Sequence, residues 1–322
     1  MGAEQPTCRL ARDGADSQSR ETVECRATRA VAGMRVLMVS IIDPSAQMGG
    51  AWTVTRAILG LLRSAPLKAE VEVVAVPQRS RIAHRFRQGA AVGQALISGL
   101  PSKVEFSRSR AFLKQVRDLF RQSFDMIVIN GTDLLWLLPH LPPAMKRLVI
   151  AHNIEHQLFA AQIDLSLHEG LAKRLLLRDL AKLRRFEVEG LSRAGNVIFL
   201  SSLDAEYARA NCPGVRSIVV PPLFGNPPLQ RPPGLRAAGT LHIGMLANFG
   251  WWPNREGLKW FVEKVVPHIS PAVQLHVFGA ESERVAPVHP RIQRHGYAAS
   301  LSDVWSSCDI MIAPISREAE SQ

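Results

Sequence analysis

The run Met34-Arg-Val-Leu-Met-Val-Ser40 is short, apolar and rich in strand-forming residues, so we predict a buried strand there. A loop with Gly49 and Gly50 follows, and apolar residues then recur with a helical period from about Trp52 to Leu62. A strand, a glycine-containing turn and a helix in this order are typical of an α/β fold. The segment therefore predicts the first unit of a Rossmann-like domain.

The same alternation continues along the chain. Further buried strands are predicted at residues 71–76, 125–130, 147–151 and 196–201. A long, charged helix is predicted over residues 168–194. Continuous apolar strands that alternate with helices favour a parallel sheet covered on both faces.

Six prolines between residues 221 and 233 predict a linker, because proline propagates neither a helix nor a central strand. The α/β pattern restarts after them, with predicted strands at 241–246, 274–279, near 292 and at 309–313. Helices are predicted at 254–268 and 301–306. We therefore predict a disordered leader (1–33), a first Rossmann-like domain (34–215), a linker (216–239) and a second, incomplete Rossmann-like domain (240–322).

The composition is that of a globular chain, with 322 residues, 47% hydrophobic and 21% charged. Cysteines at positions 8, 25, 212 and 308 form no Cys-x-x-Cys pair and no metal-ligand spacing, which favours a reducing compartment. No run reaches the roughly 18 apolar residues of a membrane span, and the start lacks an apolar signal core. We expect a cytoplasmic protein, peripheral on the inner membrane surface if it binds one.

The net charge of +11 is unevenly distributed. Residues 34–150 carry sixteen basic and seven acidic residues, whereas residues 151–322 carry eighteen and sixteen. This basic region would attract an anionic surface. The predicted helix that ends near residue 121 has one basic face, formed by Arg110, Lys114, Arg117 and Arg121.

That helix leaves two alternatives open. It can pack its apolar face into the core and expose the basic one, or it can contact a membrane or an acceptor. Nucleic acid is disfavoured as a partner, because the segment has little aromatic interleaving and no binding motif.

Gly49 and Gly50 would let backbone N–H groups at a helix start approach a phosphate. Their pattern is neither a dinucleotide fingerprint nor a Walker loop, and a plain turn is the commoner alternative. His152 follows a predicted strand at the edge where α/β sheets bind ligands, so it can hold a proton or bind a sugar hydroxyl. Its alternative role is a helix cap. Glu155 and His156 lack a third ligand, and we expect no metal.

In the second half, Trp251-Trp-Pro-Asn-Arg255 begins a predicted helix. Arg255 can bind a diphosphate, although a solvent-exposed arginine is the commoner case. The two tryptophans can instead plug a domain interface, and Tyr297 can stack on a base.

Five segments in this order resemble retaining glycosyltransferases of the GT-B fold, family 4 (group 1). They are Met34–Ser40, Met48–Gly50, His152–His156, Trp252–Leu258 and His295–Pro314. The resemblance implies two Rossmann-like domains facing a cleft, a nucleotide-sugar donor on the second domain and a saccharide or lipid-linked acceptor on the first. It implies neither a metal nor another cofactor.

The resemblance also implies site residues. Donor-binding candidates are Gly49, Gly50, Asn248, Arg255, Gly279 and Tyr297. Catalytic candidates are His152 and Glu318, the latter matching the first glutamate of a family pair. The second glutamate and its Leu-Glu-Ala-Met helix are absent before Gln322, so we expect a truncated second domain with doubtful activity and low solubility. The alternative function is an inactive chain that binds a membrane or a partner through its basic half, and a nucleotide-sugar 2-epimerase ranks third.

Overall fold

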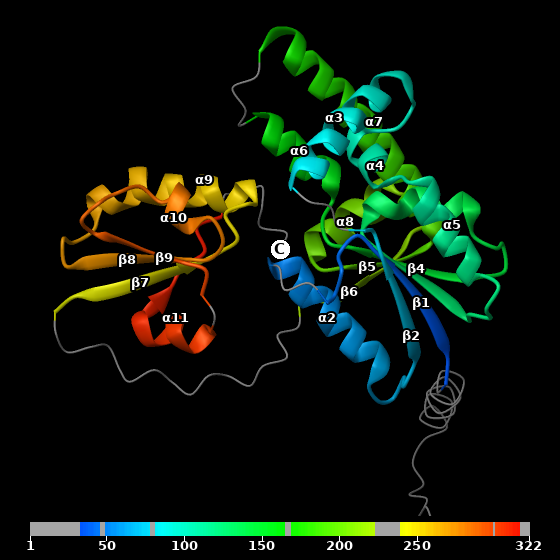
Figure 1. Ribbon diagram of the computed structural model, residues 1–322, viewed down its shortest axis with the longest axis horizontal. Helices are drawn as coiled ribbons and strands as arrows, with labels where there is room; N and C mark the ends of the chain where they lie inside the picture. The colour runs from blue at the N-terminus through cyan, green and yellow to red at the C-terminus, as the bar shows by residue number, and fades with distance from the viewer. Residues whose placement is uncertain are drawn as a thin grey trace, which may run out of the picture.

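The computed structural model describes residues 33–45, 49–77, 81–164, 169–222, 239–298 and 300–315. These residues form two lobes, and each lobe is built around its own parallel sheet (Figure 1). Almost all of the predicted leader, most of the predicted linker and the candidate Glu318 lie outside the described residues.

The first sheet has six parallel strands in the order β2-β1-β3-β4-β5-β6. Its strands are β1 (Arg35–Ser40), β2 (Glu70–Ala75), β3 (Met126–Asn130), β4 (Lys146–Ala151), β5 (Asn196–Phe199) and β6 (Arg216–Val219). Its helices are α2 (Gly49–Arg63), α3 (Arg81–Ile97), α4 (Ser102–Ser107), α5 (Arg110–Leu119), the 3-10 helix η1 (Thr132–His140), α6 (Glu155–Asp164), α7 (Gly170–Ala194) and α8 (Ser202–Asn211). The predicted parallel sheet is confirmed.

Both faces of the central strands are buried, because successive side chains of a strand point to opposite faces. Val36 and Met38 of β1 pack toward α2, in a core that includes Ile58. Leu37 and Val39 point the other way, into a larger core with η1 and α5. Helices on both faces explain why these strands are continuous apolar runs.

The helix α5 settles one of the two alternatives for its apolar face. Phe112 and Val116 are buried in the larger core, and Leu113 packs against it. The alternative in which α5 packs its apolar face into the core is therefore confirmed. The prediction that this apolar face contacts a membrane was wrong, because the face is buried. An amphipathic pattern alone cannot separate the two, because both need an apolar face of the same width. None of the described helices is both long and apolar enough to cross a bilayer.

The strand β6 differs from the prediction, which placed residues 216–219 in the linker. It pairs in parallel with β5, and its first residue, Arg216, donates from its backbone N to the Gly195 carbonyl at 2.6 Å. Pro221 and Pro222 follow at once and cannot donate to a ladder, so the strand stays short and at the edge. The first sheet thus extends to Val219.

The second sheet has four described parallel strands in the order β10-β7-β8-β9. They are β7 (Leu241–Leu246), β8 (Val273–Phe278), β9 (Ile292–Gly296) and β10 (Ile310–Met311). The helix α9 (Trp252–Trp260) continues into a π turn (Phe261–Val265) and a 3-10 turn (Val266–His268), and α10 (Ser282–Val285) and α11 (Leu301–Ser307) follow. Figure 1 shows α9 and α10 on one face of this sheet and α11 on the other. The predicted α/β class with two parallel sheets is confirmed.

Candidate functional site

Polar side chains meet where β1, β3 and β4 end. Asn130, the last residue of β3, is fully buried and donates from Nδ2 to Ser40 Oγ and to Thr55 Oγ1, both at 2.9 Å. Its Oδ1 lies 2.8 Å from His152 Nε2. In this arrangement Asn130 Oδ1 accepts and His152 Nε2 carries the donated proton, which fixes the tautomer of the imidazole.

His152 is a neutral imidazole at pH 7. Burial lowers its pKa below the ordinary value, Glu155 opposes that shift, and Lys103 adds to it. The ring is only 9% exposed, directly after the buried end of β4. A neutral ring that donates from Nε2 retains an acceptor at Nδ1, which suits contact with a hydroxyl rather than with a phosphate.

Gly49 and Gly50 open helix α2, whose first turn has no acidic residue. A Cβ added at Gly50 would meet no atom of the described residues within 4 Å, so none of them covers the helix start on that side. Thr55 lies one turn and a half further along α2 and contacts Asn130, which ties this helix start to the His152 ring. The sequence analysis missed Asn130 and Thr55. Asn130 could have been found from the sequence, because it is the polar residue that ends the apolar strand β3.

A second polar group joins α4, η1 and α6. Lys103 forms ion pairs with the Glu155 carboxylate and, at 3.5 Å, with Asp133 Oδ1. Burial lowers the pKa of Lys103, but the two carboxylates together raise it above its usual value. Burial raises the pKa of Asp133 to about 7, and its Oδ1 has no hydrogen-bond partner among the described residues. These residues were not predicted as site residues, because three separate elements contribute them.

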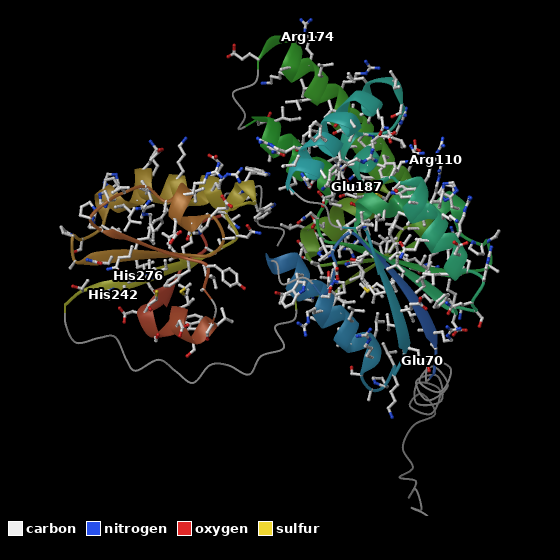
Figure 2. The ribbon with its side chains drawn as sticks, viewed as in Figure 1. Glu70, Arg110, Arg174, Glu187, His242 and His276 are labelled. Carbon is white, nitrogen blue, oxygen red and sulfur yellow. The ribbon has the colours of Figure 1, made fainter. Side chains whose placement is uncertain are left out.

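Glu187 of α7 holds the start of α6. Its buried carboxylate accepts from the backbone N of Glu155 at 2.9 Å and of His156 at 3.1 Å, and from His156 Nδ1 at 2.6 Å. His156 Nε2 is 2.9 Å from the Tyr207 hydroxyl. Both ring nitrogens of His156 are therefore used within the core, where Figure 2 shows Glu187, and this histidine positions α6.

A cavity of about 530 Å³ adjoins the Lys103 group. Its polar lining includes Ser102, Lys103, Asp133, Glu155, Gln88, Gln162 and Asp179, and its aromatic lining includes Phe106, Phe159, Trp251 and Trp252. The two tryptophans belong to the second lobe, so this cavity takes walls from both lobes. Their predicted place at a domain interface agrees with this lining.

The candidates of the second lobe lie at the carboxyl ends of its strands. Asn248 Oδ1 accepts from the backbone N of Gly250, and Arg255 Nη1 donates to the Phe249 and Gly250 carbonyls, all at 2.9 Å. A Cβ at Gly279 would approach the Ala247 carbonyl oxygen to 1.9 Å, so only glycine fits there.

Gly279 donates its backbone N–H to the Gly296 carbonyl at 2.6 Å, which brings the ends of β8 and β9 together. Tyr297 follows and is 69% exposed. The structure thus gathers four of the six predicted donor candidates, Asn248, Arg255, Gly279 and Tyr297, at the carboxyl edge of the second sheet, whereas Gly49 and Gly50 lie at the start of α2 in the first lobe. Their binding roles stay predictions, and Glu318 falls outside the described part of the chain.

The basic face of α5 is exposed, as Figure 2 shows for Arg110. Arg117 contacts His140 at 3.2 Å and Arg121 pairs with Asp118 at 3.9 Å. None of the four basic residues of that face lines the cavity. Their contact with a membrane or an acceptor stays a prediction.

A row of three histidines crosses the second sheet, and Figure 2 labels two of them, His242 and His276. His276 Nε2 is 2.8 Å from His242 Nδ1, and His276 Nδ1 is 2.9 Å from His295 Nε2. Burial lowers the pKa of His295 below its ordinary value. Because each neutral ring carries one N–H, the three rings form both hydrogen bonds without a positive charge.

Comparison with known proteins supports this description. Residues 240–321 match the family model of glycosyl transferases group 1. The chain is similar to a sucrose-phosphate synthase from Thermosynechococcus elongatus, at 13% identity and a TM-score of 0.52, over 89% of this chain and 78% of that one. It is also similar to TarM of S. aureus, a variant solved with Fondaparinux, alpha-GlcNAc-glycerol and UDP, at 8% identity and a TM-score of 0.53, over 86% and 80%.

A third similar structure is an alpha,alpha-trehalose-phosphate synthase (UDP-forming) from Burkholderia xenovorans, solved with glucose-6-phosphate. It has 9% identity and a TM-score of 0.50, over 88% of this chain and 80% of that one. No curated protein matches the sequence. The resemblance to group 1 glycosyltransferases of the GT-B fold is confirmed, by the family model for the second lobe and by fold for most of the chain.

Proposed function

We propose that this chain, whose second lobe matches group 1 glycosyltransferases, transfers a sugar from a nucleotide-sugar donor to a saccharide hydroxyl with retention of anomeric configuration. The observation that supports the site best is the contact between His152 Nε2 and Asn130 Oδ1, which Asn130 Nδ2 extends to Thr55 of α2. It presents a neutral imidazole of fixed tautomer at the ligand-binding edge of the sheet, in a chain of hydrogen bonds that reaches Thr55 of α2.

The leaving group of this reaction is a nucleoside diphosphate, on which negative charge develops. Backbone N–H groups at the start of α2, at Gly49 and Gly50, would stabilise that charge through hydrogen bonds and the helix dipole. Arg255 has guanidinium N–H groups beyond the two backbone contacts of its Nη1, and these would bind a phosphate oxygen. His152 Nδ1 would accept a hydrogen bond from a hydroxyl of the transferred sugar and so orient its reacting face.

The cavity beside Lys103 suits the acceptor. Sugar hydroxyls bind carboxylates and side-chain amides such as Asp133 and Gln162, and the apolar face of a sugar ring packs on Trp251 or Trp252. Three carboxylates and one lysine line this cavity, which favours an uncharged saccharide over a phosphorylated one. A polysaccharide end or the head group of a lipid-linked sugar has this chemistry.

The proposal is tested by incubating the purified chain with nucleotide sugars and measuring release of the nucleoside diphosphate, with and without saccharide acceptors. NMR of the product gives the anomeric configuration, and calorimetry gives donor affinity. His152→Ala should lower turnover about 100-fold or more while donor affinity changes little. The control is His268→Ala, an exposed histidine of the second lobe.

Equal turnover of His152→Ala and the wild type would refute the role of His152. If a bound donor is neither transferred nor hydrolysed with any acceptor, the chain binds nucleotide sugars without catalysis. An epimerised donor, formed without an acceptor, would identify the epimerase alternative instead.

A further inference from the structure

A second cavity of the first lobe lies apart from the acceptor cavity. It measures about 560 Å³, takes its walls from α3, α4, α5 and η1, and is lined among others by Arg87, Glu105, Arg108, Arg110, Trp136 and His140. Among the described residues, none lines both cavities. Helix α4 stands between them, because Ser102 and Lys103 line the acceptor cavity and Glu105 lines the other. We call this second cavity the arginine cavity.

Positive charge prevails in the arginine cavity. Among the described residues that line it, three arginines face one carboxylate, that of Glu105. Glu105 is buried, and its two oxygens lie 3.2 Å and 3.4 Å from Arg108 Nη1. Arg110, labelled in Figure 2, is exposed at the start of α5 and has no side-chain partner among the described residues. Two positive charges of the lining are therefore left without a counter-charge.

Arg87 is held in place by the end of α4. Its Nη2 donates to the carbonyls of Glu105 and Arg108, and its Nε donates to the Phe106 carbonyl at 3.3 Å. A guanidinium that is already fixed by backbone groups loses little conformational entropy when an anion binds beside it. Arg87 thus supplies a fixed positive charge, whereas Arg108 and Arg110 keep N–H groups that a ligand can use.

The His140 ring responds to this positive charge. Burial lowers the pKa of His140 below its ordinary value, and Arg117 and Arg108 lower it further. Arg117 Nη2 lies 3.2 Å from His140 Nδ1, which accepts because a guanidinium can only donate. The Trp136 ring meets the His140 ring edge-on, with centroids 6.3 Å apart, and forms an aromatic wall of the same cavity. A bound anion would therefore raise the pKa of His140.

We propose that the arginine cavity binds a small soluble phosphate monoester, such as a sugar phosphate, with its phosphate oxygens on Arg108 and Arg110 and its carbon skeleton beside Trp136. A phosphate monoester carries about two negative charges at pH 7, which matches the two uncompensated charges of the lining. Guanidinium groups bind phosphate oxygens through paired hydrogen bonds. A monocarboxylate would leave one positive charge uncompensated. The site goes beyond the proposed function and does not depend on it.

The test is an NMR titration of the full chain, labelled at its histidines, with glycerol 3-phosphate and without nucleotide sugar or acceptor. The His140 signals, assigned with His140→Gln, should shift saturably with a Kd of about 1 mM or below. The pKa of His140 should rise by about half a unit or more, because a bound negative charge favours the imidazolium. His268, an exposed histidine of the second lobe, should not respond. Glycerol, and sodium chloride at the same ionic strength, should not produce the saturable shift.

Two variants should change the affinity in opposite directions. Arg110→Gln should weaken binding at least about fivefold, because one guanidinium is lost. Its control is Arg121→Gln, an exposed arginine beyond the end of α5 that changes the net charge equally and should bind as the wild type does. Glu105→Gln should strengthen binding about threefold or more, because the carboxylate that competes for Arg108 is gone. Melting temperatures verify that all variants are folded.

Four outcomes would overturn the proposal: no saturable shift of His140 at low salt, equal affinities of Arg110→Gln and Arg121→Gln, weaker binding by Glu105→Gln than by the wild type, or a shift that vesicles containing phosphatidylglycerol produce and soluble phosphates do not. The last result would assign these arginines to lipid headgroups. None of the measurements involves sugar transfer. Failure of phosphate binding and failure of the proposed function are therefore separate results.

Discussion

Asn130 Oδ1 and His152 Nε2 are 2.8 Å apart, at the ends of neighbouring parallel strands. The contact joins two residues that are 22 positions apart in the sequence, and Thr55 extends it to helix α2. It gives His152 a defined tautomer, while burial keeps the ring neutral by lowering its pKa. The tautomer of this histidine is therefore set by an uncharged amide.

Replacing that amide with a carboxylate changes the charge of the histidine. In Asn130→Asp we expect the pKa of His152 to rise by about one unit or more, because a neighbouring negative charge favours the imidazolium. NMR titration of the His152 ring protons measures it. Asn211→Asp on α8 is the control and should leave the His152 titration unchanged. A His152 pKa that is equal in Asn130→Asp and the wild type would contradict the contact.

Asp133 should contribute less to the stability of the first lobe as the pH rises from about 4 to 7. Burial raises the pKa of Asp133 to about 7, so the folded chain holds a proton that the unfolded chain, with a pKa near 3.9, has already released. Burial raises the pKa of Asp204 to about 7 as well, and this acts in the same direction.

The contribution of Asp133 to the unfolding free energy of the wild type should be lower at pH 7 than at pH 4.5. In Asp133→Asn the loss of unfolding free energy from pH 4.5 to pH 7 should therefore be smaller than in the wild type by about 1 to 3 kcal/mol. Urea unfolding at both pH values measures it. Asp118→Asn, whose side chain is half exposed on α5, is the control. An equal loss in the Asp133 variant and the wild type would show that this carboxyl does not hold the proton.

The strands of both sheets could be predicted because helices cover both faces, which makes each strand a continuous apolar run. His152 and the second-lobe candidates could be located because they follow such runs. Contacts between separate elements could not be predicted, since Lys103 and Glu155 are 52 positions apart and neither stands in a motif. The arginine cavity was missed as well, because Arg87 and Arg108 are 21 positions apart and meet only where α3 packs on the end of α4.

Glu187→Gln should destabilise the chain by about 2 kcal/mol. The amide cannot accept at both oxygens, so the His156 contact or a backbone N–H at the start of α6 is left without its charged partner. Chemical unfolding gives the free energy. Glu189→Gln is the matched control on α7, since its carboxylate is half exposed and pairs only on the surface, and we expect less than about 0.5 kcal/mol. Similar losses in both variants would show that Glu187 does not anchor α6.

His295 of the second lobe should respond to acid in the opposite sense to Asp133. The row of His242, His276 and His295 can share one added proton, but a second proton would place two N–H groups against each other. Because burial lowers the pKa of His295, the folded lobe resists protonation and loses stability as the pH falls below about 6.5.

Hydrogen exchange of the β8 amides at pH 7 and pH 5.5 measures this response. His295→Asn should reduce the extra exchange at pH 5.5, and His268→Asn, an exposed histidine, should not. Equal acceleration in both variants would assign the acid response to other groups.

Gly279→Ala should cost the second lobe about 3 kcal/mol or more, or prevent its folding. The residue has φ +116°, and a Cβ there would overlap the Ala247 carbonyl oxygen at 1.9 Å, so the backbone itself must move. Gly60→Ala in α2 is the control, because its Cβ would meet no atom within 4 Å and alanine favours a helix by about 1 kcal/mol. Thermal unfolding should show one variant below the wild type and the other at or above it. A melting temperature of Gly279→Ala equal to that of the wild type would mean that the ends of β7 and β8 are further apart than described, and the donor edge built on them would lose its support.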